Sequence, residues 1–192
     1  EQVSSLLGDD NLFAIRYLMQ RVGVANSANF TRFETTYAGP SVASLLLKDP
    51  AILRGLRADK AFSFSEAEEE WDAVSLAEYI DQRVRLDGVR ATTMRRLSYY
   101  HPDANFGRYF LQNIHRITDE LIRLKVKQQA GEHVRYLQGA IDETNNPEHK
   151  RAMTALLMEQ ERLRMLVSIE SPYAANVIEP AASSAKVAWP DT

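Results

Sequence analysis

The four histidines have the widest chemical use of any side chains in this sequence, because imidazole can ligate metals and transfer protons near neutral pH. No two of them stand in the HxxxH spacing, and none has a glutamate in the HxxE spacing, so no helical face would present two metal ligands together. We therefore expect no metal site and no cofactor. The histidines are His101, His115, His133 and His149.

Nucleophiles for covalent catalysis are equally scarce. The chain has no cysteine, and it contains neither a GxSxG motif nor a glycine-rich phosphate loop. The adjacent carboxylates Asp119-Glu120 and Asp142-Glu143 could act as acid and base. Neighbours on a helix point about 100° apart, however, and cannot converge on one substrate. We interpret both pairs as solvated faces and expect no enzymatic activity.

Arginines form the remaining candidate site. Arg108, Arg116 and Arg123 recur along a predicted long helix, alternating with acidic residues. Such residues form ion pairs across helix faces or contribute to an interface between subunits. The formal net charge of −3 argues against nucleic-acid binding, which needs a surplus of cations. The three arginines are therefore our candidates for an oligomer interface.

The first hundred residues must supply the body that positions these side chains. Apolar residues at steps of three and four predict a helix over Asn11–Val22 and further helices at Phe30–Tyr37 and Ser41–Lys48. Pro50 starts another helix, and a capping box at Ser75–Glu78 opens one that runs to about Arg83. The acidic stretch Phe62–Asp72 is interpreted as a solvated loop or short helix.

The second half predicts strands and two long helices. Val84–Leu86 and Thr92–Tyr100 are expected to form a hairpin around Asp87-Gly88. A helix from Pro102 to Asn145 would be about 65 Å long, so it must project from the body. After the turn at Asn145–Pro147, a second helix to Val167 would pack antiparallel to it. Ala174–Ile178 is a closing strand, and Glu179 onward is expected to be a tether.

The predicted fold is therefore α+β and predominantly helical, with a small sheet-containing base and a long projecting antiparallel helical hairpin. We divide it into residues 1–100 (first part of the base), 101–167 (the arm) and 168–192 (closing strand and tether). The longest apolar runs fall far short of the roughly 20 residues that span a bilayer. Because no basic and then apolar leader follows Glu1, we expect this sequence to be a piece of a longer protein.

Several segments, taken in order, resemble the Wzz-type polysaccharide co-polymerases, the chain-length determinants of bacteria and their capsule-export relatives. Arg95–Arg123, "RRLSYYHPDANFGRYFLQNIHRITDELIR", is similar to the family's strand followed by a long helix. Ala152–Ser168 resembles its returning helix, and "YAANVIEPA" at Tyr173–Ala181 resembles its final strand. Phe33–Leu56 is similar to the upstream helical part. The strand that the family has before its first helix is missing from this prediction or lies upstream of Glu1.

The resemblance implies a periplasmic domain of a bacterial inner-membrane protein, lying between two transmembrane helices outside this sequence. It implies homo-oligomers that regulate the chain length or export of a surface polysaccharide, without a catalytic site in this domain. The implied partners are further copies of the chain, the polysaccharide polymerase or export machinery, and the glycan as a further candidate. If both ends continue into one membrane, Glu1 and Thr192 should lie at one end of the molecule and Asn146 at the other.

Two other classes of function remain open. The helical hairpin could be a coiled-coil interaction module of a cytoplasmic scaffold, and the chain could be a small enzyme with an unrecognised site. Runs of about 20 apolar residues on both sides of the chain would favour the membrane protein over the scaffold. A concave pocket lined by ionisable groups would favour the enzyme.

Overall fold

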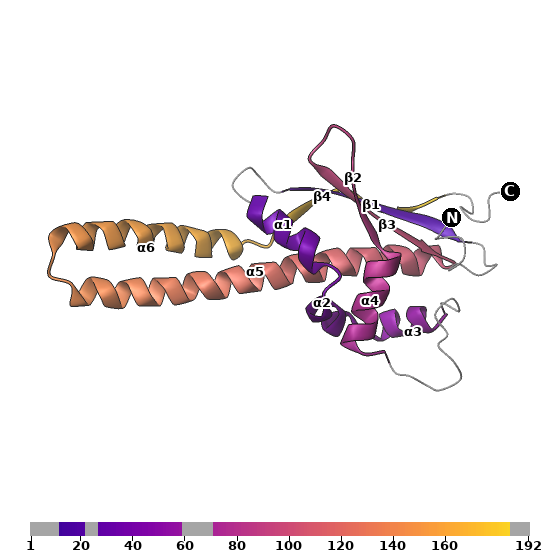
Figure 1. The fold of residues 1–192 in the computed structure, drawn as a ribbon, viewed down its shortest axis with the longest axis horizontal. Helices are drawn as coiled ribbons and strands as arrows, with labels where there is room; N and C mark the ends of the chain where they lie inside the picture. The colour runs from indigo at the N-terminus through magenta and orange to yellow at the C-terminus, as the bar shows by residue number, and fades with distance from the viewer. Residues whose placement is uncertain (1–11, 22–26, 59–70, 185–192) are drawn as a thin grey trace.

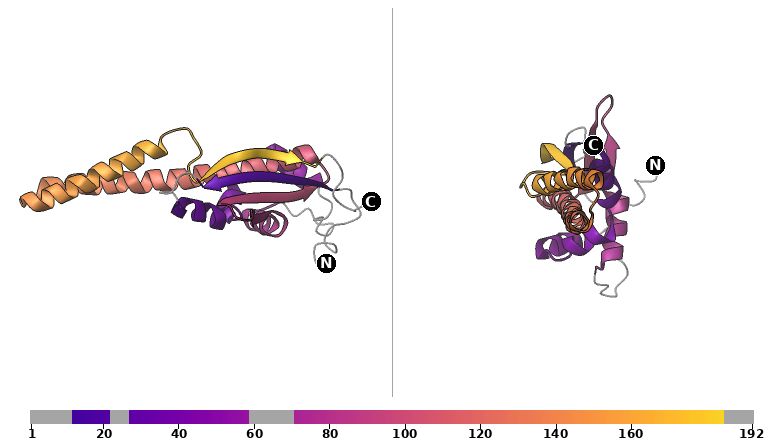
Figure 2. Two further views of the ribbon diagram at one scale, coloured as in Figure 1. Left: turned by 90° about the horizontal axis from the view of Figure 1, so that it is seen from above. Right: turned by 90° about the vertical axis from the view of Figure 1, so that its left-hand side faces the viewer.

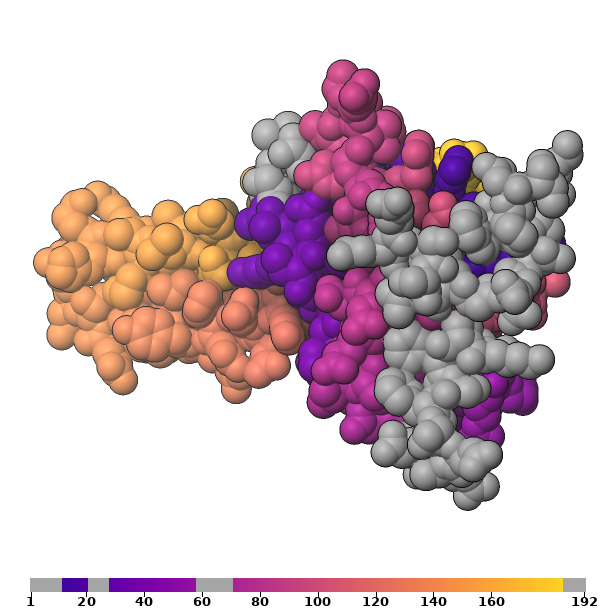
Figure 3. Space-filling model, turned by 45° about the vertical axis from the view of Figure 1, so that its right-hand side comes forward, coloured from indigo at the N-terminus to yellow at the C-terminus, as the bar shows by residue number. Residues whose placement is uncertain are grey.

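The structure is a computed structural model, and it describes residues 12–21, 27–58 and 71–184. A base of helices and strands carries one long arm, which stands clear of it (Figures 1 and 3). Six helices and one four-stranded sheet occupy the described part of the chain. The predicted α+β, predominantly helical fold is therefore confirmed.

The arm consists of α5 (Ala104–Glu143) and α6 (Pro147–Val167). The Asp103 carboxylate caps the start of α5 by accepting from the backbone N–H groups of Asn105 and Phe106. The Asn146 side chain caps α6 in the same way, and Pro147 occupies its first turn. Both predicted helices are confirmed, and α5 continues without a break through Gly131.

The sheet contains β1 (Phe13–Arg21), β2 (Arg85–Gly88), β3 (Met94–His101) and β4 (Ala175–Ser183) in the order β2-β3-β1-β4. All neighbouring strands are antiparallel. With helices between β1 and β2 and between β3 and β4, this is the split βαβ connectivity. The three strands expected to share one sheet do so, and they share it with a fourth.

The helices of the base lie on one face of this sheet (Figures 1 and 2). They are α1 (Ser27–Thr36), α2 (Pro40–Leu46), α3 (Pro50–Ala58) and α4 (Ala73–Arg83). The first half of α5 runs against the sheet and contacts β1, β3 and β4. Its Phe110 packs there with Tyr79 of α4 and Tyr99 of β3, and all three are buried. This burial fixes the arm to the base.

The helix predicted over Asn11–Val22 is wrong, because Phe13–Arg21 forms β1, the strand between β3 and β4. Ile15, Tyr17 and Met19 alternate along it, and each is at most 4% exposed. The apolar residues of this segment fit both a helical and a strand spacing. Pairing with two neighbouring strands stabilises the strand.

Three further boundaries differ from prediction. The tether expected from Glu179 onward is wrong over 179–183, where β4 continues through Pro180. β4 is an edge strand, and its register against β1 shifts around this proline. Asp87 and Gly88 belong to β2, and the turn follows them, with Ala91 at φ 57°. Helix α4 begins at Ala73 with Asp72 as its N-cap, so Ser75 closes the capping box instead of opening it. Residues 62–70 of the predicted acidic loop lie outside the described residues.

Candidate interaction surface

The two halves of α5 have different surroundings. From Phe106 to Ile122 the helix is buried in the base along one side, with Phe110, Leu111 and Ile114 fully inaccessible. Helix α5 is much longer than α6, but this surplus length leaves no uncovered apolar surface, because the base itself covers it. The distal half of α5 lies beside α6 alone, so the exposed surface of the helix is in that half (Figure 1).

Asp119 joins the arm to the sheet at the point where the chain returns from α6. Its carboxylate accepts hydrogen bonds from the backbone N–H groups of Tyr173 (3.0 Å), Ala174 (2.6 Å) and Ala175 (3.3 Å), just where β4 begins. Asp119 is only 3% exposed, and Arg123, one turn later, lies 3.4 Å from it. Three charge-assisted bonds to consecutive amides hold the first residues of β4 against α5.

His115 completes this junction. Its Nε2 donates to the carbonyl oxygen of Ala175 at 2.8 Å, and its ring packs against Tyr17 and Phe33. Burial lowers the pKa of His115 below its usual value, against the opposing effects of the Ala175 hydrogen bond and the Asp119 charge. The imidazole therefore serves as a neutral donor within the fold.

The expectation that Asp119-Glu120 is a solvated pair is thus wrong for Asp119, whereas Glu120 is exposed. A signal was available in the sequence. His115 and Asp119 lie at four-residue steps after Leu111 and before the buried Ile122 and Val126, so they share an apolar stripe. Polar residues within such a stripe need partners when they are buried, and here the backbone supplies them.

The three candidate arginines lie on the half of α5 that belongs to the base. Arg108 hydrogen bonds to Asn105, and Arg116 lies 3.4 Å from Glu120 and 3.0 Å from Asn113. Arg123 is paired with Asp119 and keeps only 25% of its side chain exposed. All three are engaged within their own helix. Their role in an oligomer interface remains a prediction, and Arg123 also has a structural role.

The other histidines and the second carboxylate pair do not come together in one site. His101 is buried and stacks on Tyr99, while His133 and His149 are exposed on the arm. Asp142 and Glu143 are exposed near its tip. Within residues 12–21, 27–58 and 71–184, no three His, Cys, Asp or Glu side chains come close enough to hold a metal ion.

The seam of the arm resembles a coiled coil. On α5 the shielded positions recur every three or four residues at Val126, Ala130 and Val134, and on α6 they include Met153, Leu157 and Val167. The His133 ring lies 3.3 Å from the Gln160 side chain across the seam. This contact marks the register of the hairpin, in which the middle of α6 lies beside the part of α5 around His133.

Exposed apolar side chains gather on the arm. Of the eleven large hydrophobic residues exposed in the described chain, six are on the distal half of α5 or on α6, and a seventh follows α6 directly. Clusters of exposed apolar residues mark interaction surfaces. The seven are Leu124, Tyr136, Leu156, Met158, Met165, Leu166 and Ile169.

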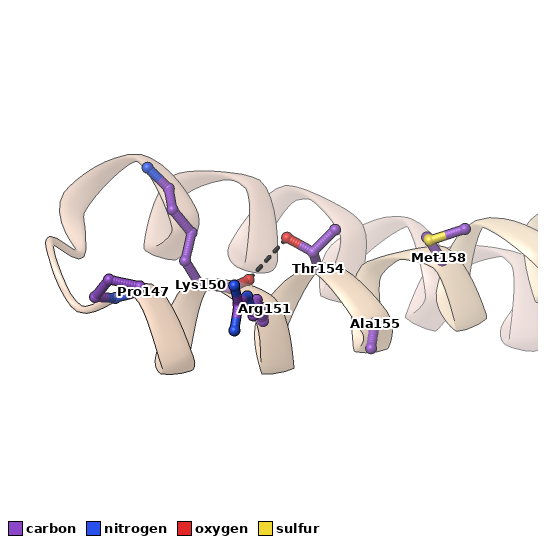
Figure 4. A pocket seen from close by; sticks show the side chains of 6 residues that line it. All are labelled: Pro147, Lys150, Arg151, Thr154, Ala155 and Met158. Atoms are coloured by element: carbon purple, nitrogen blue, oxygen red, sulfur yellow. Dashed lines mark hydrogen bonds between the residues drawn. The ribbon is translucent and has the colours of Figure 1, made fainter.

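A shallow hollow near the tip lies on the same helix (Figure 4). Its lining comes from α6 alone, and the Thr154 hydroxyl there donates to the Lys150 carbonyl at 2.8 Å. A surface built from one helix cannot enclose a small substrate, because ligand sites bury most of their ligand. The lining residues are Pro147, Lys150, Arg151, Thr154, Ala155 and Met158.

Comparison with known proteins adds no relative: no family model matches the chain, and no curated protein matches it significantly. Among the helices that the structure describes, none is both long enough and apolar enough to cross a membrane.

Proposed function

We propose that this chain is the periplasmic domain of a bacterial inner-membrane polysaccharide co-polymerase. In this role it regulates the length or export of a surface polysaccharide by forming a homo-oligomeric scaffold. The proposal takes its family from the sequence resemblance. The observation that carries it is that the two ends of the described chain lie side by side, at the end of the molecule opposite the tip of the arm.

Those two ends are neighbours. Ile15 pairs with Ser183 across β1 and β4, and the Ala14 backbone N–H donates to the Ser184 hydroxyl at 3.2 Å. The turn at Asn146 lies at the opposite end of the molecule (Figure 1). Glu1 and Thr192 themselves lie outside the described residues. Ends side by side and an arm pointing away from them suit a domain anchored twice in one membrane.

The corrected strand order strengthens this support. A strand now precedes the first helix, as the family pattern requires, and β4 continues through the proline-containing segment that resembles the family's final strand. The coiled-coil scaffold remains the alternative, favoured by the heptad-like seam between α5 and α6.

Cells lacking the full-length gene product test the proposal. Their surface polysaccharide, separated by gel electrophoresis, should lose its modal length or its export, and the parent gene should restore it. A gene product without apolar runs of about 20 residues on both sides of this domain would favour the scaffold instead. An unchanged polysaccharide in the deletion strain would contradict the proposed function directly.

A further inference from the structure

The β2–β3 hairpin concentrates positive charge in an acidic chain. Residues 83–96 contain five arginines and a single carboxylate, Asp87, whereas the whole chain has a formal net charge of −3. Three of these arginines are exposed and form no ion pair within the described residues. They are Arg85, Arg90 and Arg96. The hairpin therefore presents several guanidinium groups to solvent.

Two of the three arginines lie on the sheet face that points away from the helices of the base. Side chains alternate between the two faces of a strand. Ser98 stands between Leu97 and Tyr99, which are both fully buried on the helix-covered face, so Ser98 lies on the opposite face (Figure 2). Arg96, two residues earlier on β3, shares that face. Arg85 shares it as well, because it is paired directly with Ser98 across β2 and β3.

Arg16 of β1 adds a further cation to this face. It is exposed, and it is paired directly with Ser98 on the side opposite Arg85. Because neighbouring strands lie about 4.8 Å apart, the backbones of Arg16 and Arg85 flank Ser98 at about 10 Å from each other. A carboxylate placed over Ser98 would be within reach of both guanidinium groups and of the hydroxyl donor between them.

Two carboxylates share the face, each one row of the sheet away from Ser98. Asp87 lies opposite Arg96 across β2 and β3, and Glu179 lies opposite Leu18 across β4 and β1. Neither carboxylate forms an ion pair within the part of the chain that the structure describes. With the turn of the hairpin included, four exposed arginines stand against these two acids. This surplus of positive charge is complementary to an anionic partner.

Shape and position narrow the choice of partner. An open sheet face cannot enclose a small anion, so it suits an extended polymer. The turn of the hairpin lies at the end of the sheet where Met94 pairs with Gln20. The two ends of the described chain meet at the other end of the strands, where the Ala14 backbone N–H donates to Ser184. In the proposed two-anchor topology the membrane lies beyond those ends, so the turn points away from it.

We infer that an acidic polysaccharide binds the arginine face, which consists of Arg16, Arg85, Arg90 and Arg96. Its carboxylates lie along the hairpin and between the arginines of neighbouring strands. Tyr100, 37% exposed on the same sheet face, offers an aromatic ring beside them. The inference rests on the proposed function for the polysaccharide itself. It adds that the polymer is acidic and where on the domain it binds.

Titration calorimetry of the whole chain with an oligogalacturonate tests the inference, and a maltooligosaccharide of equal length is the uncharged counterpart. The oligogalacturonate should bind at low ionic strength, and its affinity should fall as salt is added, because salt screens exposed charges. The neutral oligosaccharide should bind much more weakly. Equal binding of the two, or none by the parent chain, would overturn the inference.

Two triple variants locate the site. Arg85→Gln, Arg90→Gln and Arg96→Gln together should weaken oligogalacturonate binding at least about tenfold, because each guanidinium lost removes charge-assisted hydrogen bonds. The matched control removes the same charge from three exposed arginines of the arm and should change the affinity less than about twofold. Circular dichroism should stay unchanged in both variants, since all six side chains are exposed. The control substitutions are Arg135→Gln, Arg151→Gln and Arg162→Gln.

Other partners for the face would give other results. Equal losses in the two triple variants would show that only overall charge matters and would overturn the inference. A hairpin variant that keeps oligogalacturonate binding but loses binding to phosphatidylglycerol vesicles would assign the face to lipid. One that keeps it but loses self-association in sedimentation would assign the face to a second copy of the chain. Either result would overturn the inference.

This inference and the proposed function fail differently. If the parent chain does not bind the oligogalacturonate while polysaccharide length depends on the gene, the arginine face is wrongly assigned and the proposed function stands. If binding is lost in the hairpin variant but deletion of the gene leaves the surface polysaccharide unchanged, the binding face stands and the proposed function is wrong.

Discussion

Asp119 shows how one buried carboxylate can determine where a long arm returns to its base. Three backbone N–H groups of the segment entering β4 depend on it, and their alternative partner, water, is excluded at this depth. The side chain thereby links the middle of α5 to the edge strand of the sheet. Its replacement should affect folding rather than any chemistry.

Asp119→Asn keeps the shape but removes the charge, and its amide can offer only one oxygen as acceptor. We expect the free energy of unfolding to fall by about 1.5–3 kcal/mol, the range for hydrogen bonds to a charged group. Urea denaturation followed by circular dichroism measures this loss. Glu120→Gln, the adjacent exposed carboxylate paired with Arg116, is the matched control and should change stability by less than about 1 kcal/mol. Equal effects of the two variants would show that the buried bonds contribute little.

His115 should make folding sensitive to mild acid. Its pKa is lowered in the folded state, so the unfolded chain binds the proton more readily, and protonation favours unfolding. The stabilisation is present above the unfolded pKa of about 6.5 and diminishes as pH falls below it. His115→Gln keeps a donor for the Ala175 carbonyl but cannot titrate. Thermal midpoints at pH 7.5 and pH 5.5 should fall more for the parent than for this variant, and parallel falls would contradict the assignment.

At the scale of elements, the sequence predicts those whose signals are local. Proline at the first turn, asparagine before it and a sustained three-to-four spacing locate α6 to within a residue. The same kind of spacing locates α5 to within two residues at each end. Such features need no knowledge of distant parts of the chain.

The wrong predictions concern segments whose structure depends on residues far away in the sequence. Phe13–Arg21 fits a helical period, yet it lies between β3 and β4, strands that begin more than 70 and 150 residues later. Pro180 suggested the end of structure, but an edge strand tolerates a missing donor. Asp119 is predicted to be solvent-exposed, because the local sequence does not show that β4 begins beside it. Long-range pairing supplied information that no local window contains.

Two glycines in α5 should respond in opposite directions to the same change. An added Cβ at Gly107 would lie 2.5 Å from Cδ1 of the buried Ile15, so Gly107→Ala should destabilise the protein by about 1–3 kcal/mol. Gly139 has nothing within 4 Å, and Gly139→Ala should stabilise it by up to about 1 kcal/mol. Thermal unfolding of both variants beside the parent checks the signs. A stabilising Gly107→Ala would mean that α5 does not press against β1 as described.

At the scale of the whole molecule, the base and the distal arm depend on different contacts. The core of the base joins residues of β1, β3, α4 and the first half of α5, and along the arm it reaches Val126 and Val167. Beyond these, the seam continues only between α5 and α6, as the clear separation of arm and base indicates (Figure 3). The arm is thus an appendage whose length the fold of the base does not require.

Shortening the arm should therefore leave the base intact. Removing residues 134–159 and joining His133 to Gln160 through a short glycine-containing turn keeps the seam around Val126 and Val167. We expect the strand signal in circular dichroism to persist and the thermal midpoint of the base to shift by only about 2–4 °C, which corresponds to roughly 1 kcal/mol in a chain of this size.

The same deletion removes Tyr136, Leu156 and Met158, three of the exposed apolar side chains of the arm, so self-association through the arm should be lost while the base remains folded. In sedimentation, the deletion variant should be a monomer at concentrations at which the parent associates. A variant that associates as the parent does would place the self-association in the base instead. Collapse of the base in the variant would show that the arm and base fold as one unit, and the description of the arm as an independent appendage would have to be abandoned.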